Sequence, residues 1–157
     1  MAKPDPALDA IDQRILQLLM HNGRLSNHAI AETVKIAEST SHTRVKALVD
    51  NGVIKGFRAV VDPTALGRPI QAMILVKVQT TARSKLLAEA QRLAEADGVL
   101  TVFFLAGAYD LMVHVAVANP AALRDFVIRE LSASPNIAST ETSVIMEHVS
   151  GADLTPV

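Results

Sequence analysis

The chain has 157 residues, enough for one medium domain or two small ones, and its formal net charge is −1. Half of its residues are apolar but only 3% are aromatic, so the core must be built from aliphatic side chains. The absence of cysteine excludes disulfides, thiolate zinc sites and cysteine nucleophiles, and it fits the cytoplasmic location that we expect. The N-terminal sequence has no apolar run typical of a signal peptide. No apolar run approaches the ~18 residues of a membrane span, so we expect no membrane partner.

The charge is divided unevenly along the chain. Residues 1–60 hold eight Lys or Arg against six Asp or Glu, whereas residues 61–157 hold seven against ten. Affinity for phosphates rises steeply with the number of cations presented, so a monomer with so weak a positive balance would hold DNA poorly. If DNA is the partner, a dimer or a larger assembly is therefore expected.

Two helices are expected first. Asp5 and Pro6 form a helix start, and a 3.6-residue apolar stripe follows until Asn22-Gly23 ends it. Ser26 is the expected N-cap of the second helix, which carries Ile30 and Val34 on one face. The stripe of the first helix consists of Leu8, Ile11, Ile15, Leu18 and Leu19.

A third helix is expected to begin near Ser39 or Thr40 and to end at Gly52, with Val45, Leu48 and Val49 buried. Its outward face is short-chained, hydroxyl-rich and cationic, which suits a helix lying in a DNA major groove. A solvated face in an all-helical domain is the alternative at this point. The residues on or beside this face are Ser39, Thr40, Thr43, Arg44, Lys46 and Ala47.

Residues 54–61 (IKGFRAVV) are typical of a strand, and Asp62-Pro63 ends it. The pattern predicts a three-helix domain over 1–53, a strand and linker over 54–69, a second domain over 70–148 and a tail over 149–157.

The second domain has strand-type alternation over 71–79, 99–106, 111–118 and 137–147, with helices over 83–96 and 121–131. We expect Leu86, Leu87, Ala90 and Leu93 to face inward from the first helix. The tight connection at 107–110 favours a hairpin over a parallel βαβ unit, so the pattern predicts a ferredoxin-like βαββαβ domain and an α+β chain. The apolar character of both sheet faces predicts dimerisation through the sheet.

Support for catalysis is weak. His28 and Glu32 lie four residues apart on a helix, but a surface pair is more common than a metal site without a third ligand. Asp110 and His114 could form an acid–base pair, although a polar pair at a sheet end is more common. With no nucleophile or phosphate-binding loop, we expect no enzyme, no metal and no cofactor.

The turn Gly107-Ala108-Tyr109-Asp110 stands out. Its glycine exposes backbone amides, tyrosine supplies an amphipathic wall, and aspartate could hold an ammonium group. An ordinary hairpin turn is the alternative.

The chain resembles the Lrp/AsnC family of bacterial and archaeal regulators from about Leu8 to Glu147. The resemblance lies in LDAIDQRILQLLMHNGRLSNHAIAETV, RVKALVDNGVIKGFRAVVDPTALG, GAYDLMVHVAV and IASTETSVIMEH, in this order. It implies a winged-type helix-turn-helix, a hinge strand and an amino-acid-sensing βαββαβ domain, in dimers that often assemble into octamers.

The resemblance also assigns residues. It puts Ser39, Thr40, Thr43, Arg44 and Lys46 on the recognition helix. Gly107, Tyr109 and Asp110 fall on the turn that borders the effector site between dimers, and Thr140 and Thr142 fall near that pocket.

Three residues depart from the family pattern. Lys35 replaces the turn glycine, so we expect a non-glycine conformation or another path there. Ala37 replaces the N-cap serine, which leaves Ser39 or the Glu38 carboxylate to serve the helix start. Ala47 replaces a frequent arginine, which affects the DNA sequence read.

The prediction is a sequence-specific DNA-binding transcriptional regulator that responds to a small effector, an amino acid, at a subunit interface. The effector's ammonium would meet Asp110 and its carboxylate the turn amides. The alternative is an amino-acid-sensing oligomeric module without DNA binding; an amino-acid-metabolising enzyme is disfavoured.

Overall fold

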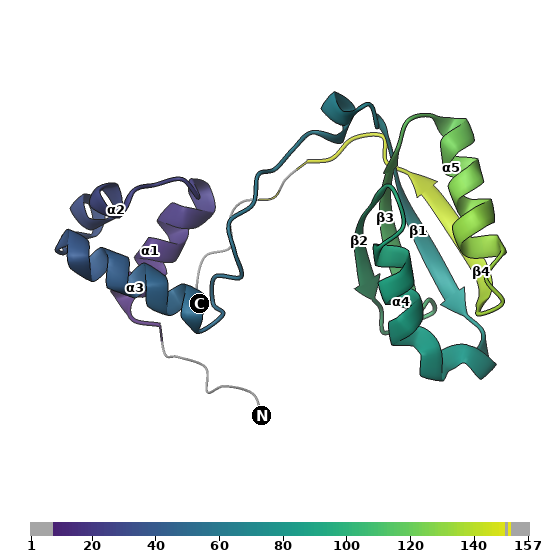
Figure 1. Ribbon diagram of the computed structural model, residues 1–157, viewed down its shortest axis with the longest axis horizontal. Helices are drawn as coiled ribbons and strands as arrows, with labels where there is room; N and C mark the ends of the chain where they lie inside the picture. Colours follow the sequence, from purple (N-terminus) through teal and green to yellow (C-terminus); the bar gives the residue numbers. More distant parts are fainter. Residues whose placement is uncertain (1–7, 150, 152–157) are drawn as a thin grey trace. The chain divides into compact units, whose positions relative to one another are not determined.

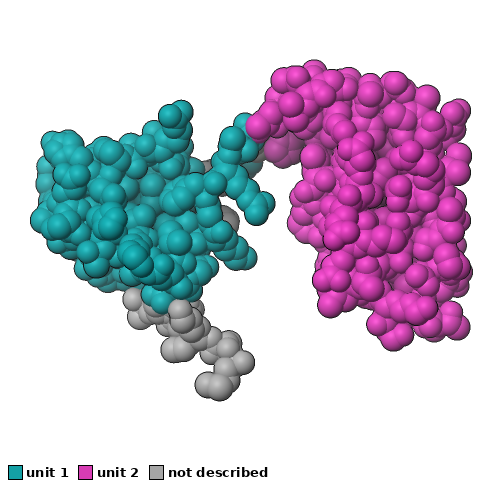
Figure 2. Space-filling model, viewed as in Figure 1, with its two compact units in different colours: residues 1–60, 150–157 teal, residues 61–149 magenta. Residues whose placement is uncertain are grey.

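The computed structural model describes residues 8–149 and residue 151. The chain divides into two compact units, with the division between Val60 and Val61 (Figure 2). This division falls inside the expected linker 54–69, whose own limits stay predictions.

The described residues of the first unit form three helices, α1 (Ala10–His21), α2 (Asn27–Val34) and α3 (Glu38–Asp50) (Figure 1). The Asp9 side chain caps α1 by accepting from the Asp12 N–H at 2.8 Å, so the helix begins at Ala10. The expected cap at Asp5-Pro6 lies outside the described residues. Ser26 caps α2 as predicted, through the Ala29 N–H at 3.1 Å. The buried residues of this unit's apolar cluster are Ile15, Leu19, Ile30 and Leu48.

The turn between α2 and α3 keeps a glycine-type backbone although its residue is Lys35. Lys35 has φ 61° and ψ 49°, the left-handed conformation, and its N–H donates to the Ala31 carbonyl. The expectation of a non-glycine conformation or another path was therefore wrong. The packing of α2 against α3 imposes the left-handed residue, and lysine adopts it at an energetic cost.

The start of α3 also differs from expectation. The helix begins at Glu38, and its N-cap, Ala37, has an extended backbone without a side-chain cap. The Glu38 carboxylate does not serve the helix start but lies 3.4 Å from His28 Nδ1. Val49 is 41% exposed instead of buried, whereas Ser41, one turn before Val45 on the inward face, is fully buried.

The strand expected over 54–61 is absent from the described chain, in which these residues have no regular secondary structure. A strand needs a hydrogen-bonded neighbour, and the sheet of the second unit is complete without this segment. The prediction is therefore wrong for the single chain.

The second unit is a four-stranded sheet with strand order β2-β3-β1-β4. Its strands are β1 (Ile70–Val78), β2 (Val99–Phe104), β3 (Leu111–Val117) and β4 (Ile137–Val144). All pairings are antiparallel and β2–β3 is a hairpin, which confirms the ferredoxin-like α+β prediction and excludes the parallel unit. The helices α4 (Leu86–Ala94) and α5 (Pro120–Phe126) lie on one face of the sheet (Figure 1).

Three tighter or wider helical segments complete the unit. Two are 3₁₀ segments, η1 (Pro63–Leu66) before β1 and η2 (Thr80–Lys85) before α4. The third, η3 (Val127–Ser132), is a π-helical continuation of α5.

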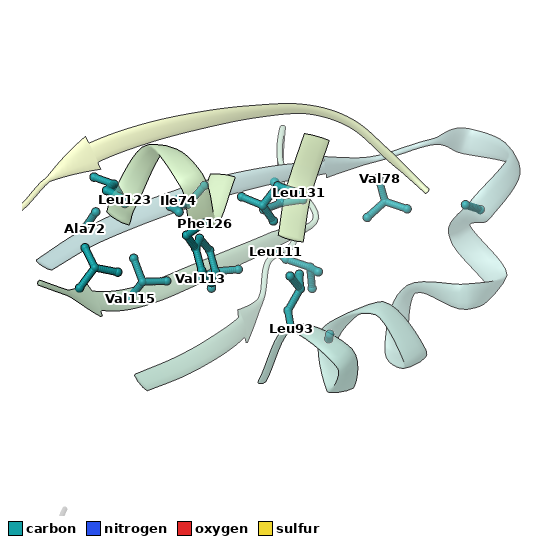
Figure 3. Close-up of a cluster of buried hydrophobic side chains, with 14 residues drawn as sticks. Ala72, Ile74, Val78, Leu93, Leu111, Val113, Val115, Leu123, Phe126 and Leu131 are labelled. Carbon is teal, nitrogen blue, oxygen red and sulfur yellow. The ribbon is translucent and has the colours of Figure 1, made fainter. Parts of the chain in front are cut away.

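The core lies between the two helices and the sheet (Figure 3). Alternate residues of β1 (Ala72, Ile74 and Val76) have no solvent exposure, as the period of two predicts. Leu93 fills the helix side as expected, but Leu87 is 61% exposed. Glu89 is buried on the same helix, where the hydrophobic pattern alone could not place it.

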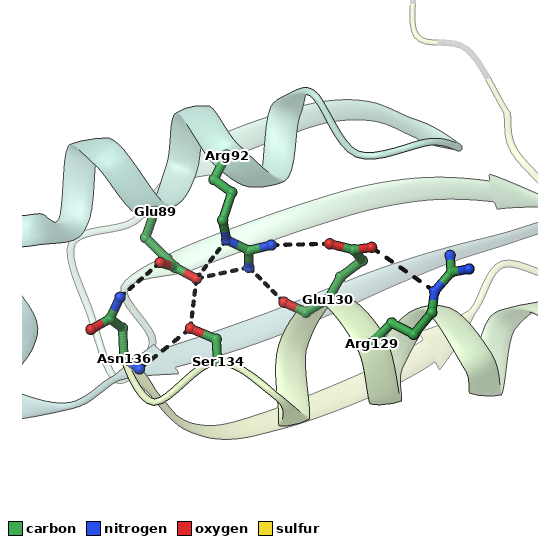
Figure 4. Close-up of polar contacts among 6 residues, drawn as sticks. All are labelled: Glu89, Arg92, Arg129, Glu130, Ser134 and Asn136. Carbon is green, nitrogen blue, oxygen red and sulfur yellow. Dashed lines mark hydrogen bonds and ion pairs between the residues drawn. The ribbon is translucent and has the colours of Figure 1, made fainter.

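Glu89 is buried as a charge because its oxygens have polar partners (Figure 4). Arg92 Nη2 donates to Glu89 Oε1 at 2.8 Å, and the Asn136 and Ser134 side chains each donate to its carboxylate at 3.0 Å. Arg92 continues to the Glu130 carboxylate at 3.0 Å and to the Glu130 carbonyl in the π-helical segment. The network therefore ties α4 to η3 and to the start of β4. Burial raises the pKa of Glu89, but the three donors outweigh it and hold that pKa below its ordinary value.

We expect Lys35→Gly to stabilise the first unit by about 0.5–1 kcal/mol, because glycine adopts positive φ without the steric cost of a Cβ. Urea unfolding at fixed protein concentration measures the change. Lys35→Ala is the control, since it removes the charge but keeps the Cβ. Equal stability of the two variants would contradict the explanation.

We expect Glu89→Gln to lower the free energy of unfolding at pH 7 by about 1–3 kcal/mol, since hydrogen bonds to a charged group are lost. The folded-state pKa of Glu89 lies below its ordinary 4.5, so its stabilisation is present above pH 4.5 and is lost as pH falls through the folded value. The gap between wild type and variant should therefore narrow on acidification, as measured by urea unfolding at several pH values. Glu95→Gln, on the exposed end of the same helix, is the control. A gap that stays constant with pH would show that the ionised form is not favoured.

Candidate DNA-binding and effector sites

The exposed face of α3 carries most of the predicted DNA-binding residues. Ser39, Thr43 and Lys46 follow at three- and four-residue spacing and are exposed, and Thr40 is exposed beside them. The Thr43 hydroxyl donates to the Ser39 carbonyl at 2.9 Å and keeps its lone pairs for an incoming donor. Lys46 forms an ion pair with Asp50 on the next turn, which offsets part of its charge.

His42 belongs to the same exposed surface and was missed by the sequence reasoning. Its position, one residue before Thr43, could have been found from the same helical projection. The uncapped Ala37 before the helix and Ala47 in its last turn have short side chains that allow close approach of a backbone.

Arg44 does not share that face. Its Nη1 lies 2.7 Å from Asp9 Oδ2 and 2.8 Å from Asp12 Oδ1, and its side chain is 29% exposed. The hydrogen bonds to Asp12 and Asp9 raise the pKa of Arg44. The backbone N–H of Asp12, followed by Arg44, lowers the pKa of Asp9. The guanidinium therefore links α3 to the N-terminus of α1, and the helical projection alone had given it to the DNA face.

The turn over residues 107–110 joins β2 to β3 and is fastened to β1 through Asp110. The Asp110 N–H donates to the Val76 carbonyl at 2.9 Å, and Asp110 Oδ2 accepts from the Val78 N–H at 2.8 Å. Lys77 Nζ and Arg83 Nη2 lie 3.8 and 3.9 Å from the carboxylate, whose side chain is 13% exposed. Asp110 is thus already surrounded by donors, which the turn sequence could not show.

Tyr109 reaches across to the edge strand β4. Its hydroxyl donates to Glu141 Oε2 at 2.6 Å, and this hydrogen bond, followed by burial, raises the pKa of Tyr109 above its ordinary value. Gly107 and Ala108 are exposed beside it, and the Ala108 carbonyl accepts from Lys77 Nζ at 2.6 Å. The turn, Lys77, Arg83 and Glu141 therefore form one cluster of polar groups.

Thr140 and Thr142 lie on the other face of β4 from Glu141. Their partners across the β1–β4 register are Val76 and Ile74, which point to the helices, whereas Glu141 is opposite Leu75. Within one chain, the structure brings Gly107, Tyr109 and Asp110 together with Glu141 instead of with the two threonines.

The two catalytic candidates of the sequence resolve into separate contacts. Asp110 binds the Val78 N–H, whereas His114 Nε2 lies 3.0 Å from Gln71 Oε1. Burial, and then the nearby His148, lowers the pKa of His114. His28 lies 3.8 Å from Glu32, the surface pair that was favoured. Among the residues that the structure describes, no three His, Asp or Glu side chains are grouped to hold a metal ion.

Two family models match the chain, one to each unit. The winged helix-turn-helix DNA-binding model matches residues 8–55, and the Lrp/AsnC ligand binding domain model matches residues 71–153. The chain belongs to the Lrp/AsnC family. It is therefore a DNA-binding transcriptional regulator with a ligand-binding domain, and not an enzyme.

Several relatives are similar to this Lrp/AsnC regulator over almost its full length. It is 48% identical over 145 residues to the HTH-type transcriptional regulator AldR of Mycobacterium tuberculosis, covering 92% of this chain and 81% of that protein. It is 34% identical to the leucine-responsive regulatory protein of Rhizobium meliloti, over 92% and 93% of the two chains. A transcriptional regulator from Neisseria meningitidis, solved as a complex with L-Met, has 27% identity and a TM-score of 0.84 over 95% and 96% of the chains.

The family membership decides between the two predicted functions. It confirms transcriptional regulation through DNA and disfavours the sensing module without DNA binding. Within residues 8–149, no helix combines the length and apolar character needed to cross a bilayer.

We expect Lys46→Ala to weaken DNA binding broadly and to reduce the slope of log affinity against log salt by about one, as for a lost phosphate contact. Arg44→Ala should leave that slope nearly unchanged and should lower the thermal unfolding midpoint instead, because Arg44 joins α3 to α1. Fluorescence anisotropy on the DNA upstream of the protein's own gene, over a salt series, measures the slope. If Arg44→Ala instead reduced the salt slope and left the unfolding midpoint unchanged, Arg44 would be a DNA contact and the structural role would be contradicted.

Proposed function

We propose that this regulator binds specific double-stranded DNA sequences as a homo-oligomer in the cytoplasm. A small amino acid, bound at a subunit interface beside the turn 107–110, changes the assembly or the placement of its DNA-binding units. The Tyr109–Glu141 hydrogen bond carries this proposal, because it gathers a carboxylate, a phenol and exposed turn residues in one place. The L-Met complex of the Neisseria relative and the leucine-responsive Rhizobium relative support an amino acid as effector.

The geometry supports a division of roles different from the one first expected. Asp110 is engaged with Val78 and lies near Lys77 and Arg83, so it holds the turn in shape. Glu141 is exposed and is the better acceptor for the effector's ammonium. Lys77 or Arg83, with the amides of Gly107 and Ala108, would receive the carboxylate.

Thr140 and Thr142 stay in the proposal on the strength of the family resemblance. Their side chains lie on the face of β4 opposite Glu141, so they would contact an effector only if a second subunit packs along that edge. The effector site would then be complete only in the assembly.

Two surfaces support assembly. The sheet face away from the helices carries half-buried or exposed apolar side chains, among them Met73, Leu75, Phe103 and Met112. Contiguous apolar surface of this kind is typical of a subunit interface. We propose a dimer through this face and further association up to octamers. The unpaired segment 54–61 would gain a strand neighbour from a second copy.

The first test is DNA binding with a panel of amino acids at two salt concentrations. Salt-sensitive, specific binding that one amino acid changes by about fivefold or more is expected, since coupling free energies are typically about 1–3 kcal/mol. Sedimentation of the same samples reports whether the assembly changes. Specific DNA binding that no amino acid alters, together with no amino-acid binding, would refute the effector part.

We expect Glu141→Gln to weaken binding of that amino acid about tenfold or more, because an ion pair with the ammonium is lost. Asp110→Ala should weaken it as well, through distortion of the turn. Glu95→Gln controls for the change in net charge, and isothermal titration measures all three. Normal effector binding by both Glu141→Gln and Asp110→Ala would contradict this site.

A further inference from the structure

A hollow of about 340 Å³ lies in the ligand-binding unit, between the segment that leads into β1 and helix α5. Its apolar wall is formed by Val117, Ala122 and Phe126, the last of which is only 2% exposed. Its polar rim is formed by Arg68, Asp97 and Arg129. None of these residues belongs to the cluster around the turn 107–110.

Arg68 is held in place at the rim. Its Nη1 donates to the Ala116 carbonyl at 3.3 Å and its Nη2 to Asp97 Oδ1 at 2.7 Å. Gly98 makes this possible, because a Cβ there would lie 2.9 Å from Arg68 Nη1 and 2.8 Å from the Ala116 carbonyl oxygen. Since these contacts use two of the five guanidinium N–H donors, the others are available to a ligand.

Arg129 enters the rim from the π-helical segment η3. It meets Glu130 only through Nε, at 4.0 Å, and its two terminal nitrogens extend away from the Glu89 network (Figure 4). Its side chain is 68% exposed, so the guanidinium is accessible. A π-helical insertion is a frequent mark of a functional site, and here it sets the position of Arg129 along the helix.

The charges and the wall define the ligand. Arg68 is paired with Asp97, whereas Arg129 makes a 4.0 Å contact with Glu130, a carboxylate that Arg92 already binds at 3.0 Å. The terminal nitrogens of Arg129 can therefore take an anion, and a planar guanidinium group suits a carboxylate. We propose that this hollow binds a small carboxylate with an apolar group, as a second ligand site of each chain. The carboxylate binds Arg129 and Arg68, and the apolar group contacts Val117, Ala122 and Phe126.

A ligand in this hollow could affect DNA binding, because Arg68 is near the end of the linker that follows the DNA-binding unit. An occupant that contacts Leu66, Gly67 and Arg68 would add contacts to the end of this linker. It would therefore influence DNA binding by a route other than the effector cluster.

Both α-amino acids and 2-oxo acids have this chemistry. The test uses L-leucine and 4-methyl-2-oxopentanoate, which differ only at the α-carbon, where the ammonium of leucine is replaced by a keto oxygen. Binding to the full-length protein is measured by isothermal titration. Arg129→Ala should weaken binding of at least one of them about tenfold. Arg124→Ala, an exposed arginine on the same helix, should change nothing.

A second variant tests the wall. Ala122→Leu narrows the hollow and should weaken the same binding, and far-ultraviolet circular dichroism checks that it is folded. The oxo acid lacks an ammonium, so its binding should survive Glu141→Gln, which separates this site from the effector cluster. Binding of leucine alone at the hollow would assign Asp97 to the ammonium. Unchanged binding of both compounds in Arg129→Ala and Ala122→Leu would overturn the proposal, whatever the result for Glu141→Gln.

Discussion

The attachment of Asp110 to the end of β1 is the constraint on which the ligand-binding unit depends. Strand β1 is central, and its pairing with β3 ends at Val76 opposite Leu111. Beyond that point the chain turns, and the N–H of Val78 would have no strand partner on that side. The Asp110 carboxylate takes this N–H while its backbone bonds Val76 and Leu105. One residue therefore completes the sheet, sets the path of the turn and brings Tyr109 to Glu141.

Ion pairs inside this molecule bear on how it must bind DNA. The stretch 39–58 contains four cations and one anion, which suggests a basic surface. Arg44, however, is bound by Asp9 and Asp12, and Lys46 is paired with Asp50, so much of that charge is already matched. Lys55 and Arg58 are exposed beyond α3 and add to the surface. The positive charge that one chain can offer to phosphates is small, which supports the proposal that several copies bind DNA together.

The spacing of apolar residues predicted most helices and strands of the chain, because this spacing reflects which face of each element is buried. The alternating residues Leu111, Val113 and Val115 are buried as predicted. Ser26 caps α2 as predicted because its side chain accepts from a backbone N–H only three residues away. The predictions of side-chain position were wrong where a residue distant in the sequence determines the position. Arg44 turns to α1, and Glu89 is buried because Arg92, Ser134 and Asn136 satisfy it. Lys35 keeps a left-handed turn because helix packing outweighs its local preference. In the polar cluster around the turn 107–110, the turn could be found from the sequence, but Glu141 could not, since only the β1–β4 register places it there.

The linking segment explains why assembly and DNA binding should be coupled. Phe57, Val60 and Val61 are exposed by half or more, on a backbone without a strand partner. Apolar side chains in this state are unfavourable in water, which supports the proposal that a second copy covers them. Because this segment joins the DNA-binding helices to the sheet, an assembly that orders it also restricts where those helices can lie. A ligand that binds one assembly more tightly than another then changes DNA affinity by that difference in binding free energy, and a ligand with equal affinity for both changes nothing.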